Sequence, residues 1–258
     1  MLDKADKALD DIKSVHLSSE TISGYSVMGT DVDINMDMEI DIDIENGLMY
    51  GDMTADYNGI NNNSSIYMKT TGNKSDLYMG QSGMWMKQTG IEKDDIYKLG
   101  YSFEGVEGMQ FYLRSMEDLN LDSDSDKENY IVSGIIGSKS SEEALEKAGF
   151  LTVINQLDSG NFMSDSEKKD LISNVSPIKA TFYIDKKTFL PSKIIMDMKE
   201  TTESIYSNMN DIVAKYGTSL DYSITKNEGI TTFSQYDSVS EITIPDEAMN
   251  GIEYQIIQ

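Results

Sequence analysis

One stretch of fifteen residues constrains the fold more than any other part of the sequence. From Asp31 to Glu45, every even-numbered residue is apolar and every odd-numbered residue is polar. Side chains alternate between the two faces of a β-strand, so this pattern predicts a strand with one dry face and one wet face. At about 3.3 Å per residue the strand would run roughly 50 Å. A strand of that length requires a large, curved or strongly twisted sheet.

The turns that follow indicate how this sheet continues. The alternating stretch stops at Asn46-Gly47, the dipeptide that two-residue hairpin turns prefer. Similar pairs follow at Asn58-Gly59, Gly72-Asn73 and Ser82-Gly83. Short runs punctuated by Gly and Asn at this spacing are typical of consecutive antiparallel strands. We therefore expect a meander of strands over residues 15–90, with Trp85 on the face opposite Met84 and Met86.

Helices are predicted at the start and in the middle of the chain. Over residues 2–14, apolar residues recur with a helical period. The same spacing is found over 108–121, at Met109, Leu113, Met116 and Leu119. Two capping boxes of the Ser-x-x-Glu form, Ser140 to Glu143 and Ser164 to Glu167, should open further helices. The sequence thus predicts a helix over 2–14 and a helical insert over 108–173, interrupted by a strand over 130–136.

The last third returns to strands, expected within residues 179–244. The predicted strands cover 179–185, 193–206, 219–225, 230–236 and 239–244, with a brief helix over 208–216. No Pro- or Ser-rich linker divides the chain. We therefore expect a single domain, 1–258, of the α+β class and mostly β.

The composition excludes several functional classes. The 258 residues carry 21 Lys and Arg against 45 Asp and Glu, a formal charge of −24. This charge excludes a nucleic-acid-binding protein, because phosphate contacts need clustered cations. Anionic lipid head groups would also repel the chain. With no Cys and one His, the chain cannot form disulfides, thiolate zinc sites or multi-histidine metal sites. No cofactor or metal is predicted. No apolar run approaches the roughly 20 residues of a membrane span.

Catalytic and cation-binding motifs find little support. Any Ser-His-Asp arrangement would depend on His16, which we expect at the surface or beside a turn. The Asp-rich stretches that begin at Asp31 and Asp122 lack the Gly at position six and the Glu at position twelve of a calcium loop. We interpret the first as a strand and the loop Asp122 to Asp126 as a solvated loop. Paired carboxylates are uninformative among 45 acids, so a hydrolase remains a distant third hypothesis, and we expect no enzyme activity.

Three stretches resemble a known family. The segment Leu2 to His16 is similar to the helix-then-strand entry of mycobacterial LppX-type and other LolA-like lipoproteins. Tyr183 to Lys193 resembles the Asp-x-x-Thr-x-x-Pro-x-Lys hairpin of those sheets, and Phe233 to Ala248 resembles their terminal strand and Ile-Pro-x-x-Ala exit. The nearest resemblance is to uncharacterised lipoproteins of Gram-positive anaerobes.

The resemblance implies a fold and a location, but no functional residue. It implies a curved antiparallel half-barrel with helices on its concave face. It also implies an extracellular protein that is anchored to the cell membrane only through an N-terminal lipid on a Cys, and that Cys is absent from this chain. From the residues alone, a cytoplasmic protein and a trimmed exported domain both remain open. The oligomeric state stays open as well.

Methionines supply the candidate binding site. There are 17, and several fall on strands where the alternation points them to the apolar side. Because Met adapts its shape to varied partners, a Met- and Ile-lined concavity suits a flexible apolar ligand such as an acyl chain. The alternative is that these side chains pack against the helices. The predicted ligand-binding residues are Ile34, Met36, Met38, Ile40, Met68, Met84, Met86, Met196 and Met198.

Two functions follow from these observations. The leading hypothesis is a non-enzymatic exported lipoprotein domain that binds an apolar or amphipathic, lipid-like ligand between its sheet and its helices. The alternative is a cell-envelope interaction or sensory module whose core is filled by its own side chains.

Overall fold

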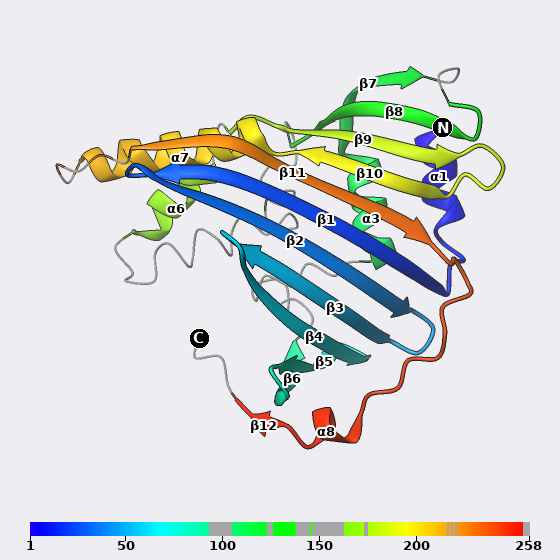
Figure 1. Ribbon diagram of the computed structural model, residues 1–258. Helices are drawn as coiled ribbons and strands as arrows, with labels where there is room; N and C mark the ends of the chain where they lie inside the picture. The colour runs from blue at the N-terminus through cyan, green and yellow to red at the C-terminus, as the bar shows by residue number, and fades with distance from the viewer. Residues whose placement is uncertain are drawn as a thin grey trace.

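A single twelve-stranded sheet organises the molecule (Figure 1). The computed structural model describes residues 1–92, 105–122, 126–137, 145, 163–172, 175–215, 217, 219 and 221–254. The strands are β1 (Ser14–Val27), β2 (Thr30–Asp43), β3 (Leu48–Tyr57), β4 (Ile60–Thr71), β5 (Lys74–Gln81), β6 (Met84–Glu92), β7 (Met116–Asp122), β8 (Asn129–Ile136), β9 (Ile178–Asp185), β10 (Pro191–Asp197), β11 (Tyr222–Ser234) and β12 (Ile252–Glu253). The helices of the described part are α1 (Leu2–Ala8), α3 (Gly105–Ser115), α6 (Asp165–Ile172), α7 (Lys199–Ala214) and α8 (Asp246–Met249).

The strand order shows how the two halves of the chain join. The order is β12-β6-β5-β4-β3-β2-β1-β11-β10-β9-β8-β7, so the sheet is open, with β7 and β12 at its edges. All neighbours are antiparallel except β12, which pairs with β6 in parallel. The meander β1 to β6 thus meets the C-terminal strands where β1 pairs with β11. The prediction of a mostly β fold built on a large sheet is confirmed.

Three apolar clusters pack the sheet and its helices. In the first cluster, helix residues pack against strand residues that include Phe182. The helix residues are Ala5 of α1, Leu9 directly after α1, and Met109 and Leu113 of α3. Figure 1 shows α1 and α3 on the same side of the sheet, behind β9, β10 and β11. The second cluster joins α6 and α7. The third contains only strand residues, and its buried members are Ile40, Met49, Ile66, Leu77 and Ile91.

The alternating stretch forms β2, and its two faces differ in burial as predicted. From Asp31 to Glu39 each odd-numbered residue is exposed, whereas the even-numbered residues between them are half-buried. Ile40 is the buried one, at 5% exposure, and Ile44 beyond the strand is 41% exposed. The face predicted to be dry, from Val32 to Ile44, is therefore buried only in part, because most of its side chains remain partly accessible to solvent.

The predicted hairpins are confirmed, whereas several predicted helix ends are wrong. The four Gly- and Asn-containing turns each join two antiparallel strands. The helix predicted over 2–14 ends at Ala8, because residues 9–13 form turns that lead into β1. The helix predicted to Leu121 ends at Ser115, because Met116 pairs with Ile136 in the sheet.

The largest error concerns residues 193–206. This stretch was predicted as one strand, but β10 ends at Asp197 and α7 begins at Lys199. The brief helix expected over 208–216 is the second half of α7. The strand predicted over 239–244 is wrong, because the structure describes these residues and their backbone is irregular. The helix expected from Ser140 lies almost entirely outside the described residues, as does most of the loop from Asp122 to Asp126.

Candidate functional site

The pairing register divides the sheet into two faces of different chemistry. Residues directly opposite each other on neighbouring strands share a face. The face that carries the even residues of β2, from Val32 to Ile42, continues through Met49 of β3 and Met68 of β4. We call it the apolar face. The other, which we call the acidic face, carries the odd residues of β2: Asp31, Asp33, Asn35, Asp37, Glu39, Asp41 and Asp43.

The predicted ligand-binding residues occupy three settings. On the apolar face, Met38 and Met68 are half-buried and pack against the third cluster, to which Ile40 belongs. Ile34 and Met36 are half-buried further along β2. Met196 and Met198 pack against the first cluster, on the other half of the sheet. Met84 and Met86 lie on edge-proximal β6, where they are 67% and 38% exposed.

Two further methionines extend the same surface, and the sequence analysis did not include them. Met53 lies directly opposite Met38, and Met79 lies opposite both Ile66 and Met86. Both are half-buried. The alternation within β3 and β5 could have identified them. Together, Met36, Met38, Met53, Met68 and Met79 form a half-buried methionine surface across β2 to β5, which we call the methionine surface.

Polar atoms are also buried on the apolar face. The Oγ of Ser64, opposite Met53, and the Oε1 of Gln88, opposite Leu77, have no hydrogen-bond partner among the described residues. A buried polar atom without a partner costs free energy unless water or a ligand supplies the missing bond. The apolar face therefore offers hydrogen-bonding sites beside its methionines.

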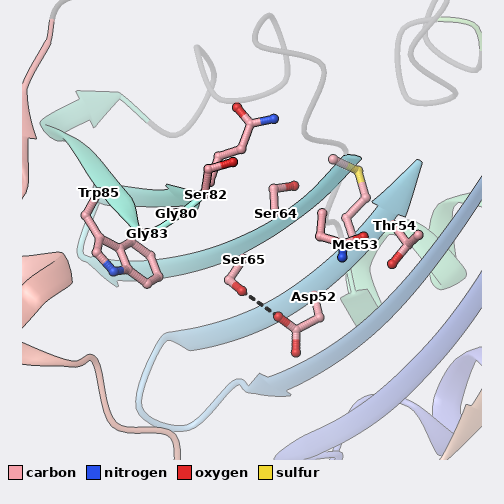
Figure 2. A pocket seen from close by; sticks show the side chains of 11 residues that line it. Asp52, Met53, Thr54, Ser64, Ser65, Gly80, Ser82, Gly83 and Trp85 are labelled. Atoms are coloured by element: carbon pink, nitrogen blue, oxygen red, sulfur yellow. Dashed lines mark hydrogen bonds between the residues drawn. The ribbon is translucent and has the colours of Figure 1, made fainter. Parts of the chain in front are cut away.

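A pocket of about 400 Å³ lies across β3 to β6 (Figure 2). Its lining includes Asp52, Thr54, Asn63, Ser65 and Trp85, which the register places on the acidic face. Figure 2 shows the side chains of Met53 and Ser64 pointing away from those of Asp52 and Ser65. Most of the lining side chains therefore lie on the acidic face, and the strands also contribute Met53 and Ser64 of the apolar face to the lining. Sequence reasoning missed it, because its residues come together only through the register of four strands.

Asp52 organises the polar end of this pocket. Its Oδ2 accepts a hydrogen bond from the Tyr50 hydroxyl at 2.5 Å, and its Oδ1 accepts one from Ser65 Oγ at 2.6 Å. Burial raises the pKa of Tyr50, and the hydrogen bond to the Asp52 carboxylate raises it further. Burial and the same carboxylate also raise the pKa of Tyr67. Both phenols are therefore neutral at physiological pH.

Trp85 forms the aromatic end. A Cβ placed on Gly80 would lie 2.8–2.9 Å from three atoms of the six-membered indole ring, so the ring lies face-on over that glycine. Tyr67 is beside it, with ring centroids 5.8 Å apart, and Tyr50 stacks on Tyr67 at 4.7 Å. A continuous aromatic row therefore borders the pocket.

His16 lies elsewhere on the acidic face, within β1 rather than beside a turn. Its Nδ1 is 2.7 Å from Asp41 Oδ1, and its Nε2 is 3.0 Å from Glu39 Oε2. The neighbouring Ser18 hydroxyl donates to Glu39. Because a carboxylate oxygen lies within hydrogen-bond distance of each ring nitrogen, neither nitrogen faces a serine hydroxyl as the base of a serine nucleophile would.

The described part of the chain contains neither a metal-ligand cluster nor a membrane-spanning helix. No group of three or more His, Cys, Asp or Glu side chains there is arranged to hold a metal ion. None of the helices in that part of the chain has the length and apolar character needed to cross a bilayer.

Comparison with known proteins identifies a family. The model of a family of unknown function, DUF6612, matches residues 1–253. No curated protein matches the chain. Similar solved structures include a DUF1329 family protein from Desulfovibrio piger, with 10% identity over 92% of this chain and 91% of that chain and a TM-score of 0.26. Another is a beta-barrel-like protein of the domain of unknown function DUF1849 from Brucella abortus, with 7% identity over 89% and 100% of the two chains and a TM-score of 0.24. The chain belongs to the DUF6612 family.

Proposed function

We propose that this protein binds an apolar or amphipathic, lipid-like ligand between the apolar face and the helices, without catalysis. In this proposal the chain is an exported domain related to LolA-like and LppX-type lipoproteins, and its apolar face is the concave side of a half-barrel. A lipid anchor on a segment outside this sequence would hold it at the outer surface of the cell membrane.

The methionine surface carries the proposal. Its five side chains are half-buried, and Met38, Met68 and Met79 pack against the third cluster, whose buried members are at most 7% exposed. Covering apolar surface stabilises a complex by roughly 25 cal/mol per Å². Partly accessible methionines next to a sealed cluster therefore offer a favourable site for an acyl chain, and their flexible side chains suit ligands of varied shape.

The buried polar atoms favour an amphipathic ligand over a purely apolar one. A head group near Ser64 would provide the hydrogen bond that its Oγ lacks among the described residues. Ser64→Ala should leave the ligand-free protein equally stable or slightly more stable, because it removes an unsatisfied group. The same variant should weaken the binding of a fatty acid more than that of the matching alkane, which isothermal titration calorimetry can measure.

A fluorescent fatty-acid probe tests the proposal directly. The intact chain should bind a dansyl-labelled fatty acid saturably and with defined stoichiometry. Met38→Trp and Met68→Trp should block the probe while the melting temperature is retained, because the larger rings fill the site. Met28→Trp is the matched control: Met28 is 73% exposed at the β1–β2 turn and should tolerate the ring with no effect on binding.

The alternative, an envelope interaction or sensory module with a filled core, makes the opposite prediction. In a solid core, the Trp substitutions would overpack and destabilise the fold by roughly 1–3 kcal/mol. The unmodified protein would also show no saturable probe binding. Organic extraction of the purified protein followed by mass spectrometry would then yield no bound lipid.

A further inference from the structure

The pocket on the acidic face combines a carboxylate, polar side chains and an aromatic ring, which together can form a second binding site. Asp52, Ser65, Gly80 and Trp85 lie directly opposite one another on β3, β4, β5 and β6, which places them in one row across four strands. With neighbouring strands about 4.8 Å apart, the row spans roughly 14 Å. The indole of Trp85 lies over Gly80, and only the small Ser65 separates it from Asp52, so the row forms a trough with a carboxylate at one end and an indole at the other.

The indole is presented as a flat platform. Gly80 is opposite Trp85, and the absence of a side chain there lets the ring lie against the strand. The surface that remains lines the pocket. The face of an aromatic ring is electronegative, so it attracts the polarised C–H groups that a pyranose ring presents on its apolar face. Tyr67 lies beside the indole, with its ring tilted by 46° to the indole plane.

Hydrogen-bonding groups line the pocket together with the indole. Each Asp52 oxygen has one protein partner and retains further acceptor capacity. Thr54, Asn63 and Ser82 also line the pocket, and all three are exposed. A polyhydroxylated ring can therefore bind in two ways at once. Its face stacks on the indole, and the hydroxyl groups at its edge form hydrogen bonds with the neutral donors and acceptors.

The charge of the surroundings decides which sugars can bind. Among the described residues that line the pocket, Asp52 alone is charged, and β2 beside it presents Asp37, Glu39 and Asp41 on the same face. An anionic sugar would be repelled by these carboxylates. A cationic peptide would find only one carboxylate in the pocket itself. A neutral glycan fits both the lining and its surroundings.

We propose that the trough from Asp52 to Trp85 binds a neutral, pyranose-containing oligosaccharide, with Trp85 stacking on one sugar ring and Asp52 accepting hydrogen bonds from hydroxyl groups of another. The Asp52 carboxylate and the Trp85 indole project from the acidic face, opposite the side chains of the methionine surface.

The chain provides its own probe, because Trp85 is its only tryptophan. Fluorescence of the intact protein should be titrated with a panel of neutral oligosaccharides, including cellohexaose, maltohexaose and chitohexaose, and with polygalacturonate and oligolysine as charged comparisons. We expect a saturable change in emission with at least one neutral oligosaccharide and none with polygalacturonate.

Variants then test the assigned roles by calorimetry. Trp85→Ala should weaken binding roughly ten- to hundredfold, because it removes the stacking surface. Gly80→Ala should weaken it comparably by displacing the ring without deleting it. Asp52→Asn should weaken it roughly tenfold. The matched controls are Tyr57→Ala and Asp37→Asn, an aromatic residue and a carboxylate outside the trough, which should bind as the unmodified protein does.

Three results would overturn the proposal. These are no saturable response to any neutral glycan of the panel, equal losses in the trough and control variants at unchanged melting temperature, or a saturable response to oligolysine alone. The last result would identify a site for cationic peptides instead. Fatty-acid probe binding should be unchanged in Trp85→Ala, Gly80→Ala and Asp52→Asn, so the sugar site and the proposed lipid site can fail independently.

Discussion

At the scale of single residues, the two faces of β2 carry the clearest energetic contrast. Ile40 is 5% exposed, whereas Asp37 on the other face is exposed. Ile40→Asp would bury an unpaired charge, and we expect it to lower the free energy of unfolding by roughly 3–5 kcal/mol. Asp37→Asn should change it by less than about 0.5 kcal/mol. Urea denaturation measures both, and equal midpoints would show that the faces have been assigned wrongly.

Asp41 shows why the choice of control matters at this scale. From the sequence, any acid of the alternating stretch could be replaced at little cost. In the structure, the Asp41 carboxylate is 2.7 Å from His16 Nδ1, and Glu39 holds the other ring nitrogen. A substitution at Asp41 therefore tests this contact with His16 and says little about which face of the strand is buried.

At the scale of elements, one carboxylate holds the β9–β10 hairpin. Asp185 Oδ1 accepts hydrogen bonds from the backbone N–H groups of Lys187 and Thr188 and from the Thr188 hydroxyl. The Thr188 N–H, more than the Lys187 N–H, holds the pKa of the Asp185 carboxyl below its usual value. Since that pKa is lower in the folded state, the stabilisation is complete above the unfolded value of about 3.9 and is lost as the pH falls through the folded value.

The hairpin can be tested by replacing that carboxylate. We expect Asp185→Ala to lower the free energy of unfolding by about 1 kcal/mol at pH 7, as the loss of a capping side chain does. The difference from the unmodified protein should shrink as the pH falls below about 4. Denaturant unfolding at several pH values checks this. A deficit that stays constant down to pH 2 would mean that the ionised carboxylate does not hold the turn.

Elements set by local chemistry could be predicted, and elements set by distant partners could not. The alternation of β2 and the capping box at Ser164, where Ser164 Oγ accepts the Glu167 N–H, both act within a few residues. By contrast, Met116 continues a helical spacing but forms a strand because Ile136 pairs with it. Thr201, Ile205, Met209 and Ile212 are buried at helical spacing in α7, but its first turns follow directly on the β-rich segment that ends β10, and this continuity favoured a strand.

The candidate sites also differ in how far they depend on local sequence or on distant partners. The methionine surface could be predicted in outline, because alternation within each strand determines which face a methionine occupies. The trough could not, because it needs the register of β3, β4, β5 and β6 at once. The aromatic residues Tyr50, Tyr67 and Trp85 sit on the face opposite the methionines of their own strands, and only cross-strand pairing turns three separate rings into one row.

At the scale of the whole molecule, the charge of −24 opposes the compact state. Repulsion between exposed carboxylates on the acidic face is screened by salt, since the Debye length falls from about 30 Å at 0.01 M to about 8 Å at 0.15 M. We therefore expect the melting temperature to rise by several degrees when sodium chloride is increased over that range at pH 7. Differential scanning calorimetry can measure the change. A fall would mean that exposed ion pairs such as Lys13–Glu45 outweigh the repulsion.

The pairing of β1 with β11 has a consequence for how the chain reaches this fold. The bond from the Thr232 hydroxyl to the Ser18 carbonyl joins residues 214 positions apart, whereas β2 to β6 are linked by short hairpins. Nearby strands can associate early, but a contact of such long sequence separation must wait for a large loop to close, which slows folding. Until β11 arrives, one edge of β1 has unpaired backbone groups and can pair with another copy of the chain. A nascent chain that lacks residues 222–234 is thus expected to aggregate, and productive folding begins only once the C-terminal strands are available.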